Sequence, residues 1–464
     1  MRAGGGLREH GATVVVAALA SLFASALILF TGVLGAALDP DLIAESGTFR
    51  LVLLVVSFVF IVIALYVGAI VTANTFATII AGRTRTIALL RLVGATSGGV
   101  RRRVAAEGLL MGAIGAGSGS LLAEALCAAA VTFGPGIGWL PEGRNYPLFD
   151  PLALVAVAVV ALTTWAAAWA GSRRVGTVSP IEATGAAVEL RPEDARGRRG
   201  RTAWAVILMT LGAVVLAIGV VLGLLTPLAL LVSFVGGLLS FTGIAIGAHL
   251  VMPPLLRATG GLIARGPAGR IAAANAVRFP ERSSRSTIGL VIGVTLVTMF
   301  AVALSSYRTM TLAAFANDPV LAAQLDSTLS ITTGVFTGLV GFSAVIAAVG
   351  LINTLSLGVL QRSRELGLLR ALGFTGSQVR GMVMLESAQM TAAALGFGIV
   401  LGIFYGWAAA QTLVGSQAGL MAPTVPWPIL VGVVVFGVAL ALGAAVTPAR
   451  RAIRVSPVAA LAVD

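Results

Sequence analysis

The sequence predicts an all-α, polytopic membrane protein with about ten transmembrane helices. Hydrophobic residues make up 58% of the 464-residue chain and charged residues 11%, whereas an ordinary soluble domain is roughly a quarter charged. Many windows exceed the run of about 20 apolar residues that crosses a bilayer core. One stretch of sequence also occurs twice, which predicts two parallel four-helix units with a two-helix hairpin between them.

Ten apolar segments are the expected membrane spans, and the arginines orient them. With the N-terminus inside, 28 of the 31 basic residues, all of them arginine, lie in cytoplasmic segments, as the positive-inside rule requires. We therefore expect a multi-pass protein of the cell inner or plasma membrane with both termini in the cytoplasm. The expected spans are 12–36, 51–80, 105–132, 151–171, 203–222, 227–252, 286–306, 331–358, 384–408 and 428–447.

The duplication divides the chain into parts. Asn74 recurs as Asn353, an offset of 279 residues, and an even number of spans separates the copies, so both face the cytoplasm. Each four-span unit ends in a basic tail containing Val-Ser-Pro. The expected parts are a first four-span unit over 1–183, a cytoplasmic linker over 184–202, a transmembrane hairpin over 203–252, a cytoplasmic or interfacial amphipathic segment over 253–285 and a second four-span unit over 286–464.

Each copy of the repeat predicts a cytoplasmic elbow, over 83–103 and 362–382. A helix leaves the membrane, continues as an Arg-rich amphipathic segment, stops at a glycine and returns. An interfacial helix with arginines on lipid phosphates would explain one copy, whereas two matched copies favour a shared partner surface, with lipid contacts alongside. The expected docking residues are Arg83, Arg85, Leu89, Arg91 and Gly94 in the first elbow and Arg362, Arg364, Glu365, Leu368, Arg370 and Gly373 in the second.

Other residues near the elbows have predicted structural roles. Thr96 or Ser97, and Thr375 in the second copy, are expected to cap the returning helices. Glu107 and Glu386 recur above the elbows and are expected to brace them, by pairing with an elbow arginine or accepting backbone hydrogen bonds. Asn74 and Asn353 are expected to bond between helices.

Three further expectations concern residues in or at the membrane. Glu124 has no acidic counterpart in the second copy. It is either a substrate or proton contact, or a structural residue that lies near the outer interface or bonds to a neighbouring helix. Segment 267–285 is expected to form one amphipathic helix on the inner surface. Close helix packing is expected at four glycines, namely Gly117, Gly119, Gly396 and Gly398.

The composition excludes several kinds of chemistry. The chain has no lysine, so it can form neither a P-loop nor a Schiff base. Its single cysteine, Cys127, allows no intrachain disulfide, and two histidines suggest no metal site. We therefore expect no catalytic residues and no cofactor on this chain, and no nucleic acid among its partners.

The stretch NTLSLGVLQRSRELGLLRALGFTGSQVRGMVMLES, with Glu386 and the closing Val-Ser-Pro, resembles the FtsX/MacB-like family of ABC transporter permeases. The resemblance implies that the elbows are coupling helices that dock two copies of a cytoplasmic ABC ATPase, which binds ATP and Mg. This chain would then be the non-catalytic membrane subunit, exporting or extracting a lipid-like or amphipathic substrate.

Two departures from the family pattern matter. Thr86 stands where the second copy has Glu365, so we expect docking sites of unequal strength. The outer loops are too short for the large extracellular domain of many family members.

Two alternatives of other classes remain. A signalling or regulatory membrane subunit would transmit ATPase state to an extracellular cell-envelope enzyme, and segment 133–150, with its aromatic residues, is the candidate surface for a small extracellular partner. A secondary transporter is disfavoured because the sequence lacks paired charges at mid-membrane.

Overall fold

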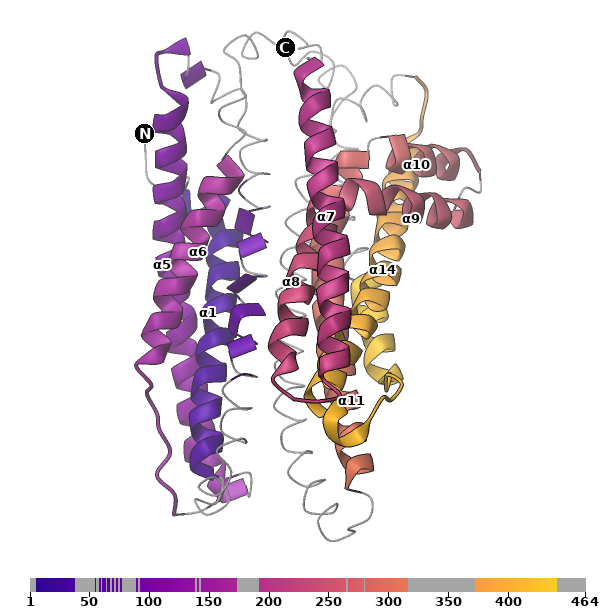
Figure 1. Cartoon of the computed structure of the whole chain (residues 1–464). Coiled ribbons are helices and arrows are strands. Elements are labelled where there is room, and N and C mark those ends of the chain that lie inside the picture. The colour runs from indigo at the N-terminus through magenta and orange to yellow at the C-terminus, as the bar shows by residue number, and fades with distance from the viewer. Residues whose placement is uncertain are drawn as a thin grey trace. The chain divides into compact units, whose positions relative to one another are not determined.

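The computed structural model describes residues 6–37, scattered positions between 55 and 76, and residues 89–90, 92–137, 140–141, 143–172, 192–263, 266–278, 280–315 and 372–439. Among these residues the regular structure is helical and no strand occurs, which confirms the predicted all-α class (Figure 1). The chain divides into two compact units, Met1–Ala187 and Val188–Asp464.

The first unit is built around the long helix α5 (Ser97–Phe133), which packs against α1 (Gly6–Ala37) and α6 (Leu152–Gly171). A short 3-10 turn, η2 (Pro135–Ile137), follows α5. Small residues allow the helices to approach closely: a Cβ at Gly119 would lie 2.0 Å from the Ala18 carbonyl oxygen of α1. At Gly112 a Cβ would meet Thr164 of α6 at 2.7 Å. Glycine is required where backbones approach this closely.

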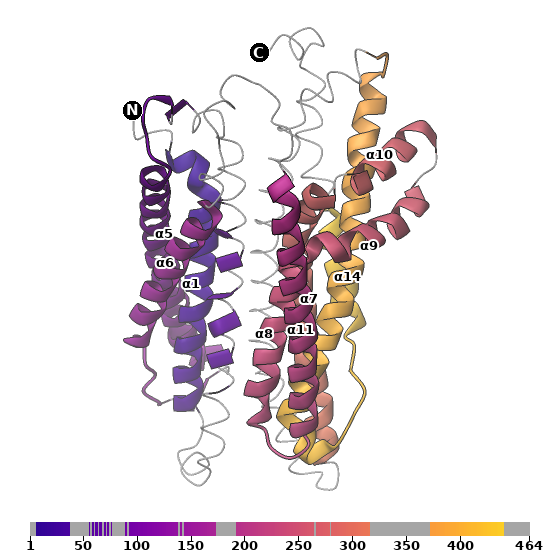
Figure 2. The ribbon, with the colours of Figure 1, turned by 45° about the horizontal axis from the view of Figure 1, so that its top comes forward.

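The second unit is organised around α14 (Gly376–Ala418). Its described partners are α7 (Pro192–Leu222), α8 (Ala229–Ile246), α9 (Ala248–Ile263), α10 (Gly266–Arg278) and α11 (Pro280–Ala314). Helices α9 and α10 run across the long axis of α14 (Figure 2), and a shorter apolar helix, Trp427–Ala439, follows α14 in the chain.

Buried hydrogen bonds hold both the α7–α8 hairpin and the loop after α14 in this unit. The hydroxyls of Ser240 on α8 and Tyr405 on α14 lie 2.8 Å apart in the interior. The fully buried Gln411 donates from Nε2 to the Gly419 carbonyl at 2.7 Å and accepts at Oε1 from the Met421 backbone N–H at 3.2 Å. The loop is therefore fastened to α14 through its backbone.

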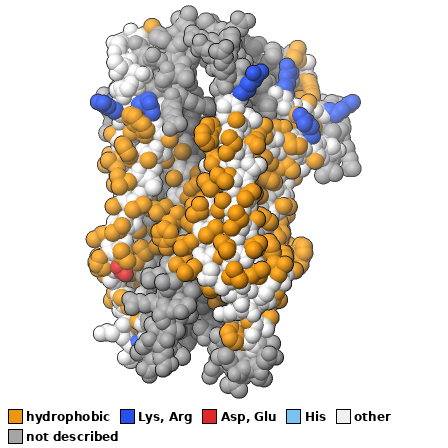
Figure 3. All heavy atoms as spheres, viewed as in Figure 1, with side chains coloured by type: hydrophobic (Ala, Val, Ile, Leu, Met, Phe, Trp, Pro, Cys, Tyr) orange, Lys and Arg blue, Asp and Glu red, His pale blue; other side chains and the backbone are white. Residues whose placement is uncertain are grey.

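Seven described helical stretches are long and apolar enough to cross a membrane. This confirms the predicted polytopic membrane protein. In each unit most basic side chains on the visible face gather at one end, and hydrophobic side chains cover the middle (Figure 3). The stretches are Thr13–Phe30, Ser97–Phe133, Leu152–Gly171, Arg199–Leu222, Ala229–Ile246, Thr287–Ala314 and Gly376–Ala418.

The remaining expected spans are described in part or not at all. The expected span 331–358 lies outside the described residues, and 51–80 is described only at scattered positions. The expected span 428–447 is described as far as residue 439.

Two predicted helix boundaries are wrong. The expected span 227–252 breaks at Gly247, where the Gly247 N–H bonds back to the Gly243 carbonyl and ends α8. The expected single helix over 267–285 is two helices, because Pro280 begins α11. Proline favours the first position of a helix and disfavours helical geometry in the residue before it.

Candidate functional site

The structure describes part of the predicted site. Leu89, Gly94, Glu107, Glu124, Gly373 and Glu386 lie among the described residues. The other predicted site residues lie outside them, namely Asn74, Arg83, Arg85, Arg91, Asn353, Arg362, Arg364, Glu365, Leu368 and Arg370.

The two elbows have the same backbone turn. Gly94 has φ +99° and Gly373 has φ +98°, a left-handed conformation that side chains other than glycine rarely adopt. No atom would lie within 4 Å of a Cβ at either position. The backbone conformation, and not a lack of space, therefore accounts for glycine in both copies.

A threonine caps the helix that follows each turn, as predicted. Thr96 accepts a hydrogen bond from the Gly99 N–H at 3.1 Å. Thr375 accepts from the Gln378 N–H at 3.3 Å, and the Gln378 side chain accepts from the Thr375 N–H at 2.9 Å. The second elbow thus has a full capping box, whereas Gly99 has no side chain to complete one.

Apolar side chains are exposed around both turns. Val93 is 89% exposed beside Gly94, and Leu372 is 71% exposed beside Gly373. In the first elbow Leu89, Leu90 and Leu92 are also exposed. Exposed apolar side chains grouped at the end of a helix are typical of a surface that binds another molecule.

The two recurring glutamates lie in different surroundings. Glu107 pairs with Arg103 at 3.4 Å, but the Arg103 side chain is 74% exposed, so the pair contributes little to stability. Glu386 is buried on the part of α14 that packs against α10. The same position of the repeat is therefore exposed to different degrees in the two copies.

One contact at the first elbow was not predicted. The Arg101 guanidinium lies 4.3 Å from the centre of the Trp169 ring and donates from Nη2 to the Trp169 carbonyl at 3.3 Å. This cation–π contact ties the start of α5 to the C-terminal end of α6. The Val-Ser-Pro tails of the two copies are 277 residues apart, so Trp169 corresponds to Val446, and the second copy lacks this aromatic partner. The sequence feature that could have indicated this contact is Trp169 itself, an aromatic residue at the end of the fourth expected span.

Glu124 lies far along α5 from the elbow. It is half-buried among the exposed Leu121, Leu122 and Leu126. Its distance from Arg103 along the helix is about 32 Å at 1.5 Å per residue, close to the thickness of a bilayer core. This length favours the outer-interface interpretation of Glu124 over a substrate contact.

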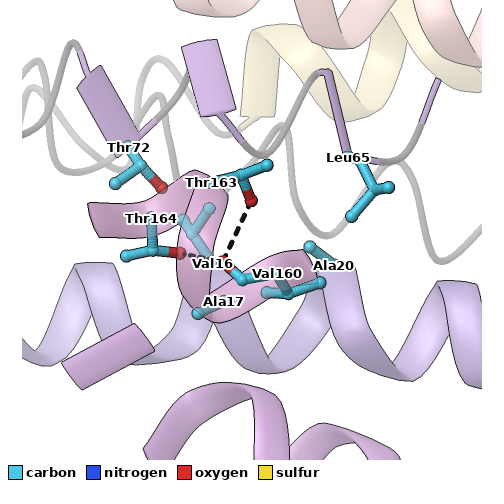
Figure 4. A pocket seen from close by; sticks show the side chains of 8 residues that line it. All are labelled: Val16, Ala17, Ala20, Leu65, Thr72, Val160, Thr163 and Thr164. Atoms are coloured by element: carbon cyan, nitrogen blue, oxygen red, sulfur yellow. Dashed lines mark hydrogen bonds between the residues drawn. The ribbon is translucent and has the colours of Figure 1, made fainter. Parts of the chain in front are cut away.

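A small cavity in the first unit lacks the features of a substrate site. It is lined by apolar side chains and three threonines (Figure 4), and it has no room for a water molecule. The hydroxyls of Thr163 and Thr164 both donate to the Val160 carbonyl, at 2.9 and 2.8 Å, so they are already engaged. The lining residues are Val16, Ala17, Ala20, Leu65, Thr72, Val160, Thr163 and Thr164. Over the described part of the chain, no group of three His, Cys, Asp or Glu residues could hold a metal ion.

Comparison with known proteins finds one family model that matches the chain at both elbows. The model of the FtsX-like permease C-terminal family matches residues 58–180 and 337–457, together more than half of the chain. Each match contains one elbow, so the family model finds the duplication independently of the offset.

Three curated proteins are similar over shorter stretches. The uncharacterized ABC transporter permease YknZ of Bacillus subtilis is 27% identical over 141 residues, which cover 30% of this chain and 34% of that protein. The uncharacterized ABC transporter permease MJ1507 of Methanocaldococcus jannaschii is 29% identical over 145 residues, 30% of this chain and 36% of that protein. The ABC transporter permease YtrF of Bacillus subtilis is 28% identical over 129 residues, 26% of this chain and 30% of that protein. The chain thus spans about a third of the length of the curated relatives that it matches.

Proposed function

Because the chain belongs to the FtsX-like permease family, we propose that it is the membrane subunit of an ATP-driven transporter. Two copies of a separate cytoplasmic ABC ATPase dock on its two elbows and bind the ATP and Mg. The permease itself carries no catalytic group and moves a lipid-like or amphipathic substrate by export or by extraction from the outer leaflet. The absence of lysine supports a separate ATPase, since a P-loop needs that side chain.

The observation that carries the proposal is the matched geometry of the elbows. The φ angles of Gly94 and Gly373 differ by one degree, a threonine caps each following helix, and the residue before each glycine, Val93 or Leu372, is an exposed apolar side chain. A repeated surface fits a repeated partner, as in assemblies with two-fold symmetry.

The helices that leave the elbows are suited to transmit a push. α5 has 37 residues and α14 has 43, so they are about 55 and 65 Å long. Each is one continuous helix from its cap to the far side of a bilayer core about 30 Å thick. Closure of the two ATPase subunits against the elbows would therefore shift these helices along their whole length.

The surroundings of the described helices support an amphipathic substrate over an ion. The described helix interiors hold many buried hydroxyl groups but only one buried carboxylate, that of Glu386. An ion pathway through a membrane normally requires charged groups facing the interior of a bundle.

Co-purification with the ATPase encoded by a neighbouring gene tests the proposal. Val93→Asp and Leu372→Asp place a charge on each apolar elbow surface without disturbing the core, because both side chains are exposed. Each single variant should recover less ATPase, and the double variant should recover none. Leu420→Asp is the matched control, since Leu420 is 69% exposed in the loop after the far end of α14. Undiminished ATPase recovery by the double variant would refute docking at the elbows.

One observation favours a second candidate, a regulatory subunit that acts on an extracellular enzyme. The outer segment between α5 and α6 is held by a hydrogen bond from the Tyr146 hydroxyl to the Pro141 carbonyl at 2.8 Å. It exposes Phe133, Leu148 and Phe149, which could contact a small partner. Replacing Phe133 and Phe149 by serine should abolish enzyme activation under this function and leave substrate transport unchanged under the first.

A further inference from the structure

Because α5 and α14 occupy equivalent positions in the internal repeat, the same face of the two helices can be compared. On α14, Met382 is buried against Ala272 of α10. About two helical turns further along α14, the Gln389 side chain donates to the Leu256 carbonyl of α9 at 2.7 Å. The residues 279 positions earlier on α5 are Arg103 and Leu110, and both are exposed. A face covered by α9 and α10 in the second unit therefore has no described helix over it in the first.

The open face changes from basic to apolar along the helix. Arg102 and Arg103 are exposed near the start of α5, and Leu109, Leu110 and Ile114 are exposed on the following turns. Positions 103, 110 and 114 lie on one stripe of the helix, since seven residues are nearly two turns and eleven are about three. Arg103 and Leu110 are about 10 Å apart along the axis, a spacing that matches the step from lipid headgroups to acyl chains.

We propose that this face of the first unit binds an anionic phospholipid of the inner leaflet. The lipid phosphate accepts hydrogen bonds from Arg102 and Arg103, and the acyl chains cover Leu109, Leu110 and Ile114. The lipid thus takes the place that α9 and α10 occupy in the second unit. The ion pair between Arg103 and Glu107 uses Nε of Arg103, and a guanidinium has four further N–H donors.

Charge and position favour a lipid over a protein segment at this face. The two arginines outweigh Glu107 by one positive charge, and α5 is a membrane-spanning helix. The cytoplasmic leaflet attracts such residues by about 1 kcal/mol per uncompensated arginine. Leu121, two further turns of the stripe away from Ile114, is 67% exposed, so the apolar face continues toward the outer leaflet.

Fluorescence quenching by brominated lipids tests the proposal in the full-length protein. Cys127 is the only cysteine, so a Cys127→Ala background allows one fluorophore at Leu110→Cys or at Leu121→Cys. The protein is reconstituted in phosphatidylcholine with increasing brominated phosphatidylglycerol, and in the reverse mixture. Phosphatidylglycerol should be preferred about fivefold at position 110, the factor for one uncompensated arginine, and not at position 121.

Two charge variants complete the test. Arg102→Gln with Arg103→Gln should reduce the preference at position 110 to about one, while Arg102→Lys with Arg103→Lys should retain it. Equal preference at both reporter positions, or an unchanged preference in the glutamine variant, would overturn the proposal. Absence of quenching by either lipid at position 110 would also overturn it, because a protein segment would then cover the face. The assay contains no ATPase, so its result does not depend on the proposed transport function.

Discussion

Gly119 and Gly117 on α5 provide a matched pair of substitutions that tests the close packing of the first unit. A Cβ at Gly119 would lie 2.0 Å from the Ala18 carbonyl oxygen and 2.8 Å from its carbon. A Cβ at Gly117 would have no atom within 4 Å. The expectation that both glycines allow close packing is therefore right for Gly119 and wrong for Gly117.

The expected magnitudes follow from these distances. Gly119→Ala must push backbone away from backbone, and overpacking of this kind costs about 1–3 kcal/mol. Since no side-chain rotation can relieve the contact, we take the upper part of that range. Alanine recovers about 1 kcal/mol of helix propensity, which leaves a net loss of about 1–2 kcal/mol. Gly117→Ala gains up to about 1 kcal/mol for the same reason, so the two variants should differ by about 2–3 kcal/mol.

The assay is the midpoint of thermal unfolding, measured for both variants in the same detergent. The repeat supplies a second pair: a Cβ at Gly398 would lie 2.9 Å from the Val294 Cβ, while Gly396 has open space. Gly398→Ala should therefore destabilise and Gly396→Ala should not, with a smaller difference than in the first unit. If the unfolding midpoint of Gly119→Ala equals or exceeds that of Gly117→Ala, then moving the two helices apart costs no free energy of unfolding, and the reasoning is refuted.

Three further predictions concern the elbows and the loop after α14. Gly99→Gln should raise the thermal midpoint, because it completes a capping box and gains about 0.5–1 kcal/mol; Gly98→Gln, which cannot reach, is the control. Trp169→Leu should cost about 1 kcal/mol, and Arg101→Gln should cost more, because it also removes the hydrogen bond to the residue 169 carbonyl; a double-mutant cycle of unfolding midpoints isolates the ring contact. Gln411→Leu removes the hydrogen bonds to the Gly419 carbonyl and the Met421 N–H, at about 1 kcal/mol each, and should speed proteolysis of the loop; unchanged cleavage would contradict its fastening role.

The features that the sequence predicted correctly depend on local patterns. Apolar runs and arginine positions predicted the membrane helices, and the repeated glycine and threonine predicted the turn and cap at Gly94, Thr96, Gly373 and Thr375. These properties depend on residues within a few positions of one another. The neighbouring residues alone therefore suffice to predict the backbone conformation at these sites.

The features that were missed depend on contacts between distant residues. The break at Gly247 lies within a continuous apolar run, so hydropathy alone cannot show it. Arg101 and Trp169 meet only after α5 and α6 pack together. Glu107 and Glu386 are equivalent in the repeat, but only the second is buried. Which glycine of a pair faces a neighbouring helix likewise depends on the rotation of both helices.

The bond between Ser240 and Tyr405 has a mechanical consequence. It fastens the α7–α8 hairpin to α14, which α9, α10 and α11 also support. A displacement of α14 at its elbow would therefore carry the hairpin with it, because this bond and the packing between the helices join α7 and α8 to α14.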